Sequence, residues 1–297
     1  MIKNLLILLR NILHFPFKIL MFLARIYSKI LSFIDPNGSE RQWEELSQKE
    51  IDKKINSNLK LKLNNYKPTL FNSEKKLKFY TPTKMASYRA HTIFSKEKDT
   101  IKWIETYGKT NRIFFDIGAN MGVYSLFYAA THKSKVYSFE PSFRNLDLLS
   151  RNISLNNLND YIYIISSPVF DKSMFNDFSK STNTAAMAEA TFGKNTKYIN
   201  TYKTLSVSLD GLVDNNLIER PNLIKIDVDG NEKEVIDGAK KIIKSDNCIS
   251  ILIETRDATS KFITKILSDS GFEKDLNFDH YDADKISDWN EIWVKNK

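Results

Sequence analysis

Cysteine and histidine are scarce in this chain of 297 residues, and their scarcity limits the chemistry that the protein can support. The single cysteine, Cys248, stands inside an apolar run, so an internal disulfide framework and a cysteine-rich zinc site are both excluded. The four histidines are scattered without the spacing of metal ligands, and we predict that the protein holds no metal. The lack of disulfides favours a reducing, cytoplasmic environment.

Long hydrophobic runs are lacking too, even in the strongly apolar residues 1–34. A transmembrane helix needs about 20 predominantly apolar residues, and a signal peptide needs an uninterrupted apolar core. Here the apolar residues are interrupted by Lys3, Arg10, Lys18, Arg25 and Lys29. At about 100° per residue these cations fall within an arc of roughly 100° on one helical face. The pattern predicts an amphipathic helix that lies in a membrane interface and is kinked at Pro16. The alternatives are a helix that packs on the protein's own core, one that forms an oligomer contact, and a tilted transmembrane helix.

Acidic residues are absent from the same segment, which carries +5 of the net charge of +8. The rest of the chain is nearly balanced, so we assign the excess charge to a membrane surface and expect no binding to nucleic acid. The expected location is cytoplasmic, with peripheral association at the inner membrane face. Residues 35–76 are rich in Lys, Asn, Glu and Ser and predict a helical connector, which leaves residues 77–297 for the main domain.

Apolar strands alternate with amphipathic helices from residue 101 onward. This alternation predicts an α/β fold with a mainly parallel sheet and helices on both faces. Strands are expected at 112–117, 135–140, 161–165, 222–230, 248–254 and 291–295, and helices at 123–132, 143–157, 232–244 and 260–271. Residues 166–210 are rich in Ser, Thr and Asn without a clear period, so we expect an irregular insertion over the functional site.

A glycine turn follows the first of these strands, in the stretch IFFDIGANMGVYS at 113–125. Gly118 and Gly122 allow a tight turn and the close approach of a ligand at the carboxyl end of a parallel strand. The spacing differs from the G-x-G-x-x-G of dinucleotide folds, and Asp116 at the strand end would repel a pyrophosphate. A carboxylate suits a cationic ligand such as S-adenosylmethionine, which has a sulfonium and an ammonium and no phosphate.

A second acid, Glu140, ends the next strand, 22 residues after Gly118. A carboxylate at this place can accept hydrogen bonds from both hydroxyls of a ribose. The two acids and the glycine turn therefore predict a site for a nucleoside without phosphate. The alternative is that Asp116 only caps the turn and that Glu140 is a solvated strand end.

The segments that hold these residues resemble the FkbM family of S-adenosylmethionine-dependent methyltransferases. They are FFDIGANMGVYSL, VYSFEPSFRNLDLLSRNISLNN and LIKIDVDGNEKEVIDGA with ILIE, and YRAHTIFSKEKDTIKWIE upstream is similar as well. The resemblance runs from about Leu77 to the C-terminus. It implies a class I methyltransferase (Rossmann-like) fold, whose seven-stranded sheet has an antiparallel last strand. It also implies O-methyl transfer, often to a sugar hydroxyl of a glycan, a glycolipid or a natural product.

The resemblance assigns cofactor-binding residues by position. Glu140 would hold the ribose, and Ser166 would lie near the adenine. The methionine end of S-adenosylmethionine would lie against Asp116, Gly118, Ala119, Asn120 and Gly122. The chain departs from the family pattern at Asp229, where a glutamate is common, and in SSPVFD after the third strand, which puts the adenine contacts in question.

The segment IKIDVDGNE holds the candidate catalytic residues. Lys225 and Asp227 are two positions apart and therefore share one face of a strand. A hydroxyl acceptor loses its proton as it attacks the methyl carbon, and a carboxylate base contributes roughly 10²–10⁴-fold to such a step. We predict Asp227 as this base, beside Lys225, with Glu232 as the second candidate. Alternatively, Asp227 contacts the ammonium of the cofactor, and Glu232 forms a helix capping box with Asp229.

Three further residues have open roles. Glu254 ends the following predicted strand, and its carboxylate has either a role in the site or a structural role. As an alternative to a site without metal, the oxygens of Glu254, Asp227 and Asp229 could bind Mg²⁺. Tyr88 and Arg89 are candidates for a lid or an acceptor contact. A base is not required if the site holds donor and acceptor in line, because positioning alone supplies much of the acceleration.

These observations predict an S-adenosylmethionine-dependent O-methyltransferase that acts on a sugar hydroxyl of a glycan or lipid-linked saccharide. Residues 1–34 would place it at the membrane surface. Two alternatives are an NAD(P)-dependent oxidoreductase, which the glycine spacing disfavours, and a catalytically silent membrane-associated adaptor that kept the fold.

Overall fold

The computed structural model describes residues 77–194, 198, 200–278 and 288–296. The chain divides into two compact units, Met1–Asn56 and Ser57–Lys297, and the described residues belong to the second. The predicted interface helix at 1–34 and the connector at 35–76 lie outside the described residues. Within the described ranges, no helix combines the length and the apolar character needed to cross a membrane.

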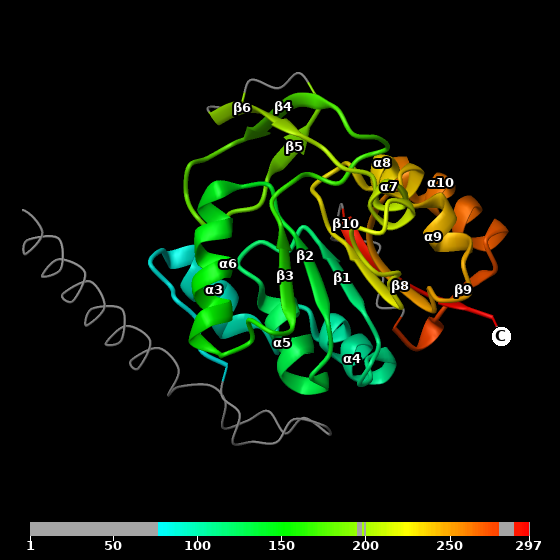
Figure 1. Ribbon diagram of the computed structural model, residues 1–297, viewed down its shortest axis with the longest axis horizontal. Helices are drawn as coiled ribbons and strands as arrows, with labels where there is room; N and C mark the ends of the chain where they lie inside the picture. Colours follow the sequence, from blue (N-terminus) through cyan, green and yellow to red (C-terminus); the bar gives the residue numbers. More distant parts are fainter. Residues whose placement is uncertain (1–76, 195–197, 199, 279–287, 297) are drawn as a thin grey trace, which may run out of the picture. The chain divides into compact units, whose positions relative to one another are not determined.

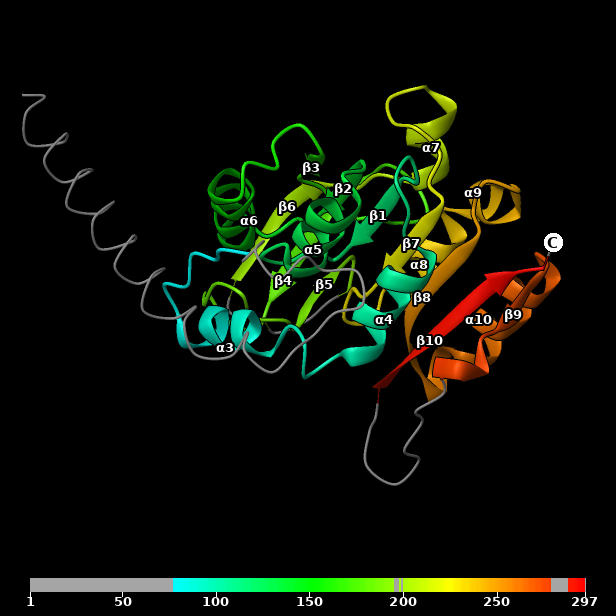
Figure 2. The same cartoon turned by 90° about the horizontal axis from the view of Figure 1, so that it is seen from below.

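Seven strands form the central sheet in the order β3-β2-β1-β7-β8-β10-β9 (Figure 1). Their bounds are β1 (Phe114–Ile117), β2 (Val136–Phe139), β3 (Ile162–Ile165), β7 (Leu223–Ile226), β8 (Ser250–Arg256), β9 (Phe272–Lys274) and β10 (Asp288–Lys295). Strand β10 runs antiparallel between β8 and β9, as Figure 2 shows, while the pairs from β3 to β8 are parallel. The predicted fold class, with its antiparallel last strand, is confirmed. The chain order reverses at β1, so the carboxyl ends of β1 and β7 border the crevice where such sheets bind ligands.

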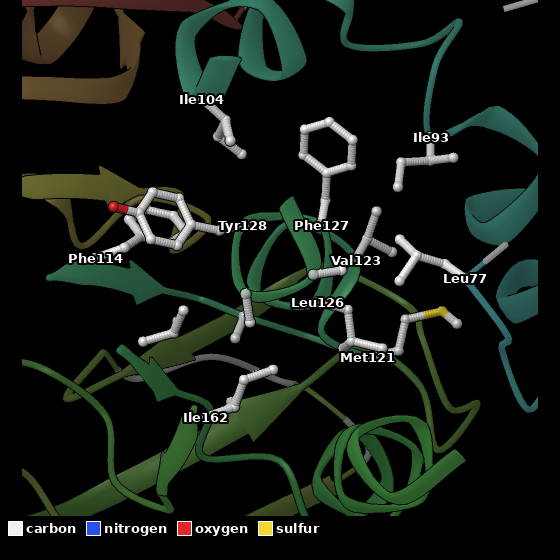
Figure 3. Packing of buried hydrophobic residues seen from close by; sticks show 14 of the residues in the cluster. Leu77, Ile93, Ile104, Phe114, Met121, Val123, Leu126, Phe127, Tyr128 and Ile162 are labelled. Atoms are coloured by element: carbon white, nitrogen blue, oxygen red, sulfur yellow. The ribbon is translucent and has the colours of Figure 1, made fainter. Parts of the chain in front are cut away.

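Helices cover both faces of this sheet, which explains why every residue of β1, β2 and β7 is buried. One core packs beneath α3 (Lys84–Thr92), α4 (Lys98–Tyr107), α5 (Val123–His132) and α6 (Phe143–Leu155). The other packs beneath α7 (Leu209–Asp214), α8 (Glu232–Asp237), α9 (Lys240–Lys244) and α10 (Asp257–Asp269). Figure 3 shows the first core, where Phe114 of β1 lies near Ile104 of α4 and Tyr128 of α5. The next residue of β1, Phe115, belongs to the second core because strand side chains alternate between faces.

The insertion at 166–210 differs from the prediction of irregular structure. It contains a three-stranded antiparallel sheet in the order β5-β4-β6, seen at the top of Figure 1. The strands are β4 (Phe175–Lys180), β5 (Ala190–Phe192) and β6 (Asn200–Leu205). Side chains along β6 alternate between half-buried and exposed, but polar residues lie on both faces, with Asn200 and Thr204 half-buried and Thr201 and Lys203 exposed. The two-residue period is therefore hidden in the sequence.

The single helix predicted at 232–244 is wrong, because the structure breaks it into α8 and α9 around Gly238. A Cβ atom at Gly238 would lie 2.1 Å from the carbonyl oxygen of Phe170. The carbonyl of Gly238 also accepts a hydrogen bond from the N–H of Asp210, at 2.9 Å. The two distant segments pack against this turn, and no local sequence signal indicates that contact.

Candidate functional site

A cleft that opens to solvent lies at the carboxyl ends of β1, β2 and β7. Its empty space is about 710 Å³, which includes the open solvent at its mouth. The central sheet contributes Ile117, Gly118, Phe139, Glu140 and Asp227 to its walls. The inserted sheet contributes residues that the sequence interpretation had not selected, among them Phe178, Lys180, Thr191 and Phe192.

The glycine turn between β1 and α5 packs tightly against its neighbours. Gly118 and Gly122 have φ angles of +84° and +85°, a region that favours glycine. A Cβ atom at Gly118 would lie 1.9 Å from the carbonyl oxygen of Asp227, and one at Gly122 would lie 2.4 Å from Leu149 of α6. Glycine therefore lets the turn lie against the end of β7 and against α6. Of the turn residues predicted to bind cofactor, Gly118 and Asn120 line the cleft, whereas Ala119 and Gly122 are not among its lining residues.

The N–H groups of this turn are engaged within the chain. Those of Gly118 and Ala119 both donate to the carbonyl of Phe139, each at 3.0 Å. The N–H of Asn120 donates to Glu140 Oε2 at 2.8 Å, and that of Gly122 donates to the carbonyl of Ala119 at 2.8 Å. A pyrophosphate is cradled by free backbone N–H groups, so this turn offers little to a phosphate.

Asp116 lies behind the turn, and it is not among the residues that line the cleft. It is buried and accepts a hydrogen bond of 2.5 Å from the hydroxyl of Ser125, while its Oδ1 atom has no hydrogen-bond partner among the described residues. Its neighbours across the sheet are Ser138 on β2 and Lys225 on β7. Burial raises the pKa of Asp116, against the effects of Lys225 and the Ser125 hydroxyl.

Glu140 stands where the ribose acid was predicted, at the end of β2 and in the wall of the cleft. Its side chain is buried, and its carboxylate accepts hydrogen bonds from the N–H groups of Asn120 and Ser142, both at 2.8 Å. Burial raises its pKa, while these hydrogen bonds and the charge of Lys180 act in the opposite direction. Ser166 is not among the lining residues, but the next two residues of the same loop, Ser167 and Pro168, are.

Lys225 and Asp227 form an ion pair at the end of β7, with Lys225 Nζ 2.8 Å from Asp227 Oδ2. The side chain of Lys225 is 2% exposed and that of Asp227 is 31% exposed, and only Asp227 lines the cleft. Burial alone would raise the pKa of Asp227, but the charge and hydrogen bond of Lys225 outweigh it, and the pKa lies below its usual value. A carboxylate held in its charged form suits contact with a cation, and it is a weaker proton acceptor.

Three more acids surround Asp227. Asp229 lines the cleft, and burial together with Asp227 raises its pKa to about 6. Glu254 lies within β8, which continues to Arg256, and its carboxylate pairs with the Arg256 guanidinium at 3.3 Å. Burial, together with the charges of Asp227 and Glu232, raises the pKa of Glu254 to about 8. Among the described residues, no group of three or more His, Cys, Asp or Glu is placed to hold a metal ion.

The capping box considered between Asp229 and Glu232 is wrong, because neither of its two side-chain hydrogen bonds forms. The N-cap residue of α8 is Asn231, which accepts a hydrogen bond at 3.1 Å from the N–H of Phe192 in the inserted sheet. Glu232 is buried, and its Oε1 atom accepts a hydrogen bond from the N–H of Gly230 at 2.8 Å. Asp229 instead accepts a hydrogen bond from Ala190 of β5, at 3.3 Å, so the loop after β7 is held by the insertion.

The segment between β4 and β5 joins the cleft to α3 and α6. The carbonyl of Ala186 accepts a hydrogen bond from Arg89 Nε at 2.7 Å, and the N–H of Ala186 donates to Asn145 Oδ1 at 2.9 Å. The Asn120 side chain donates to the carbonyl of Met187 at 3.4 Å. Arg89 lines the cleft, whereas Tyr88 is half exposed and does not. The insertion therefore lies over the site, as its position in the sequence predicted.

Comparisons with known proteins give a family match and a curated relative. The family model for the methyltransferase FkbM domain matches residues 116–278, more than half of the chain. A curated relative, the hexuronic acid methyltransferase AglP of Haloferax volcanii, is 27% identical over 192 residues, which cover 64% of this chain and 75% of the relative.

Two solved structures match the chain at low sequence identity. Precorrin-6y C5,15-methyltransferase from Geobacter metallireducens GS-15 is 12% identical with a TM-score of 0.42, over 69% of this chain and 91% of that one. Methyltransferase FkbM from Methylobacillus flagellatus KT is 13% identical with a TM-score of 0.42, over 71% of this chain and 55% of that one.

Proposed function

Because the chain belongs to the FkbM methyltransferase family, we propose that it transfers a methyl group from S-adenosylmethionine to a sugar hydroxyl of a glycan or lipid-linked saccharide. One observation carries the choice of donor. Four N–H groups of the glycine turn are engaged within the chain, and one of them holds the Glu140 carboxylate in the cleft wall. The cleft therefore offers carboxylates in place of a phosphate cradle. The sugar acceptor is supported by the name of the relative, a hexuronic acid methyltransferase.

The residues of the cleft fit S-adenosylmethionine. Glu140 offers carboxylate oxygens to the ribose hydroxyls, and the charged Asp227 suits the ammonium of the methionine end. The side-chain oxygen of Asn120 is buried without a hydrogen-bond partner among the described residues, so it is a further acceptor in the same wall. When bound, the cofactor supplies a methyl group activated by its sulfonium.

The acceptor hydroxyl must lose a proton, and the acids of the cleft differ in their ability to take it. The sequence favoured Asp227, but its ion pair with Lys225 lowers its pKa. Asp229 lines the same cleft, and its pKa of about 6 is closer to that of an efficient base near neutral pH. We therefore assign proton acceptance to Asp229 and contact with the cofactor's ammonium to Asp227. Glu232, which folds back on Gly230, has a structural role in this assignment.

Calorimetric titration of the full chain with S-adenosylmethionine and with NADH tests the donor. We expect binding of S-adenosylmethionine, loss of that binding in Glu140→Ala, and no binding of NADH. Binding of NADH in its place would support an oxidoreductase, and binding of neither would support the silent adaptor. Candidate glycans, including hexuronate-containing ones, are then incubated with isotopically labelled cofactor, and mass spectrometry locates the transferred methyl group. Cofactor binding without transfer to any saccharide would contradict the proposed acceptor class.

A further inference from the structure

A buried lysine of the insertion reaches back to the cofactor cleft. Lys180 ends β4, the middle strand of the inserted sheet, where it pairs with Ala190 of β5 and Asn200 of β6. Its residue exposure is 5%, and it lines the same cleft as Glu140. A lysine is seldom buried unless it is paired, so its surroundings indicate what it does.

Ser142 connects Lys180 to Glu140. Lys180 Nζ donates hydrogen bonds to the Ser142 hydroxyl at 3.1 Å and to the carbonyl of Met187 at 3.4 Å. The N–H of Ser142 donates to Glu140 Oε1 at 2.8 Å. The cation and the carboxylate are therefore held against the same residue, one from the insertion and one from the end of β2.

Charged groups on several elements face Lys180. Burial lowers its pKa, Glu140 on β2 and Asp229 after β7 raise it, and Arg89 on α3 adds to the lowering. Burial likewise raises the pKa of Glu140, against the backbone N–H of Ser142 and the charge of Lys180. Burial, and after it the charge of Glu140, raises the pKa of the Tyr202 phenol on β6 to about 12, so this phenol stays neutral. Lys180 is thus the cation that offsets the cost of an ionised, buried Glu140.

We propose that Lys180 is a cofactor-positioning residue, which acts through Ser142 to keep the Glu140 carboxylate ionised and oriented toward the ribose hydroxyls of the nucleoside. An ionised carboxylate only accepts hydrogen bonds, as two ribose hydroxyls require, whereas a protonated one donates through one oxygen. The insertion is then part of the cofactor site as well as its cover. This inference rests on the proposed function.

The test measures the binding of 5′-methylthioadenosine, which keeps the ribose and adenine and lacks the amino acid, from about pH 5 to about pH 9. For Lys180→Met we expect binding about 10-fold to 100-fold weaker near neutral pH, because a charge-assisted contact is lost. The loss should diminish as the pH rises, since the pKa of Glu140 is higher without the lysine and the carboxylate ionises at higher pH. Lys180→Arg should retain most of the affinity, and Glu140→Gln should bind weakly at every pH.

Lys203→Met is the matched control, since Lys203 lies on β6 of the same sheet with 73% of its side chain exposed. Equal affinity of Lys180→Met and wild type across the pH range would overturn the proposal, and so would a loss that is the same at every pH. If Lys180→Met does not fold by circular dichroism, Ser142→Ala decides: a several-fold loss near neutral pH supports the proposal, and unchanged affinity overturns it. Failure of the wild type to bind S-adenosylmethionine would overturn the proposed function itself. If the wild type binds and Lys180→Met has the same affinity for 5′-methylthioadenosine, only the proposed role of Lys180 is overturned.

Discussion

Replacing Lys225 with methionine should destabilise the protein in a way that depends on pH. Lys225 is buried between two acids, since it pairs with Asp227 at 2.8 Å and lies beside the buried Asp116 in the sheet register. Removing one partner of a buried ion pair costs about 3–5 kcal/mol. The Asp227 side chain is 31% exposed, so water compensates part of its charge, and we expect a loss of about 3 kcal/mol near neutral pH. That loss corresponds to more than about 100-fold in the unfolding equilibrium constant.

The effect of pH follows from the direction of each pKa shift. Asp227 has a lowered pKa in the folded wild type, so its contribution is present above its unfolded pKa and is lost as the pH falls through the folded pKa. Without Lys225 this contribution disappears, and the pKa of Asp116, already raised by burial, rises further. Protonation then relieves both uncompensated carboxylates of Lys225→Met, so the difference from wild type should shrink as the pH is lowered to about 4.

Urea-induced unfolding followed by circular dichroism, at neutral pH and again in mild acid, measures both effects. Lys203→Met serves as control, because its ion pair with Asp177 is exposed, and it should change the free energy of unfolding by less than about 1 kcal/mol. The reasoning is refuted if Lys225→Met lies within about 1 kcal/mol of wild type at neutral pH, or if the difference grows on acidification.

Three further predictions concern the site and the N-terminal segment. Gly118→Ala should weaken the binding of S-adenosylmethionine and lower thermal stability, because the new Cβ atom would lie 1.9 Å from the Asp227 carbonyl oxygen at a φ of +84°. Calorimetry measures the binding and thermal unfolding measures the stability, and a variant equal to wild type in both would contradict the tight packing of this turn. Because Asp229 is assigned as the proton acceptor, kcat/KM should fall as the pH drops below about 6, and Asp229→Asn should lower kcat by roughly 10²–10⁴-fold and remove this fall from the pH–rate profile. A fall at the same pH in the variant would exclude Asp229 as its origin. Removal of residues 1–34 should release the protein from anionic liposomes in a flotation assay without changing its affinity for S-adenosylmethionine, and continued binding to the liposomes would show that the anchor lies elsewhere.

Much of the fold could be predicted because its signals are local. The strands β1, β2 and β7 are mostly apolar, with a single polar or charged residue in each, and α5 spans the predicted residues Val123–His132. The insertion and the break at Gly238 were missed because each depends on contacts between distant segments. The polar composition of the insertion concealed a sheet whose buried face is made by a few residues such as Phe178 and Phe192.

The candidate site divides in the same way. Alternation along a strand was enough to place Lys225 and Asp227 on one face, and the ion pair follows from it. The same alternation also puts Asp116 on the Lys225 side of the sheet, but whether that side faced the cleft or the interior depended on how α5 packed. Lys180 had no local signal at all, since it is one lysine among many in a polar segment.

The sequence by itself determined the strand and helix periods, the turn that only glycine fits, and the acids near the carboxyl ends of two neighbouring strands, because these depend on residues close together in the chain. Only the tertiary structure decided which of those acids faces the cleft, where α8 ends, and that Lys180 lies beside Glu140. Those outcomes depend on burial and on packing between separate elements, such as α5 against β1 and β4 against the loop after β2, and the energies of such contacts are not encoded in any short stretch.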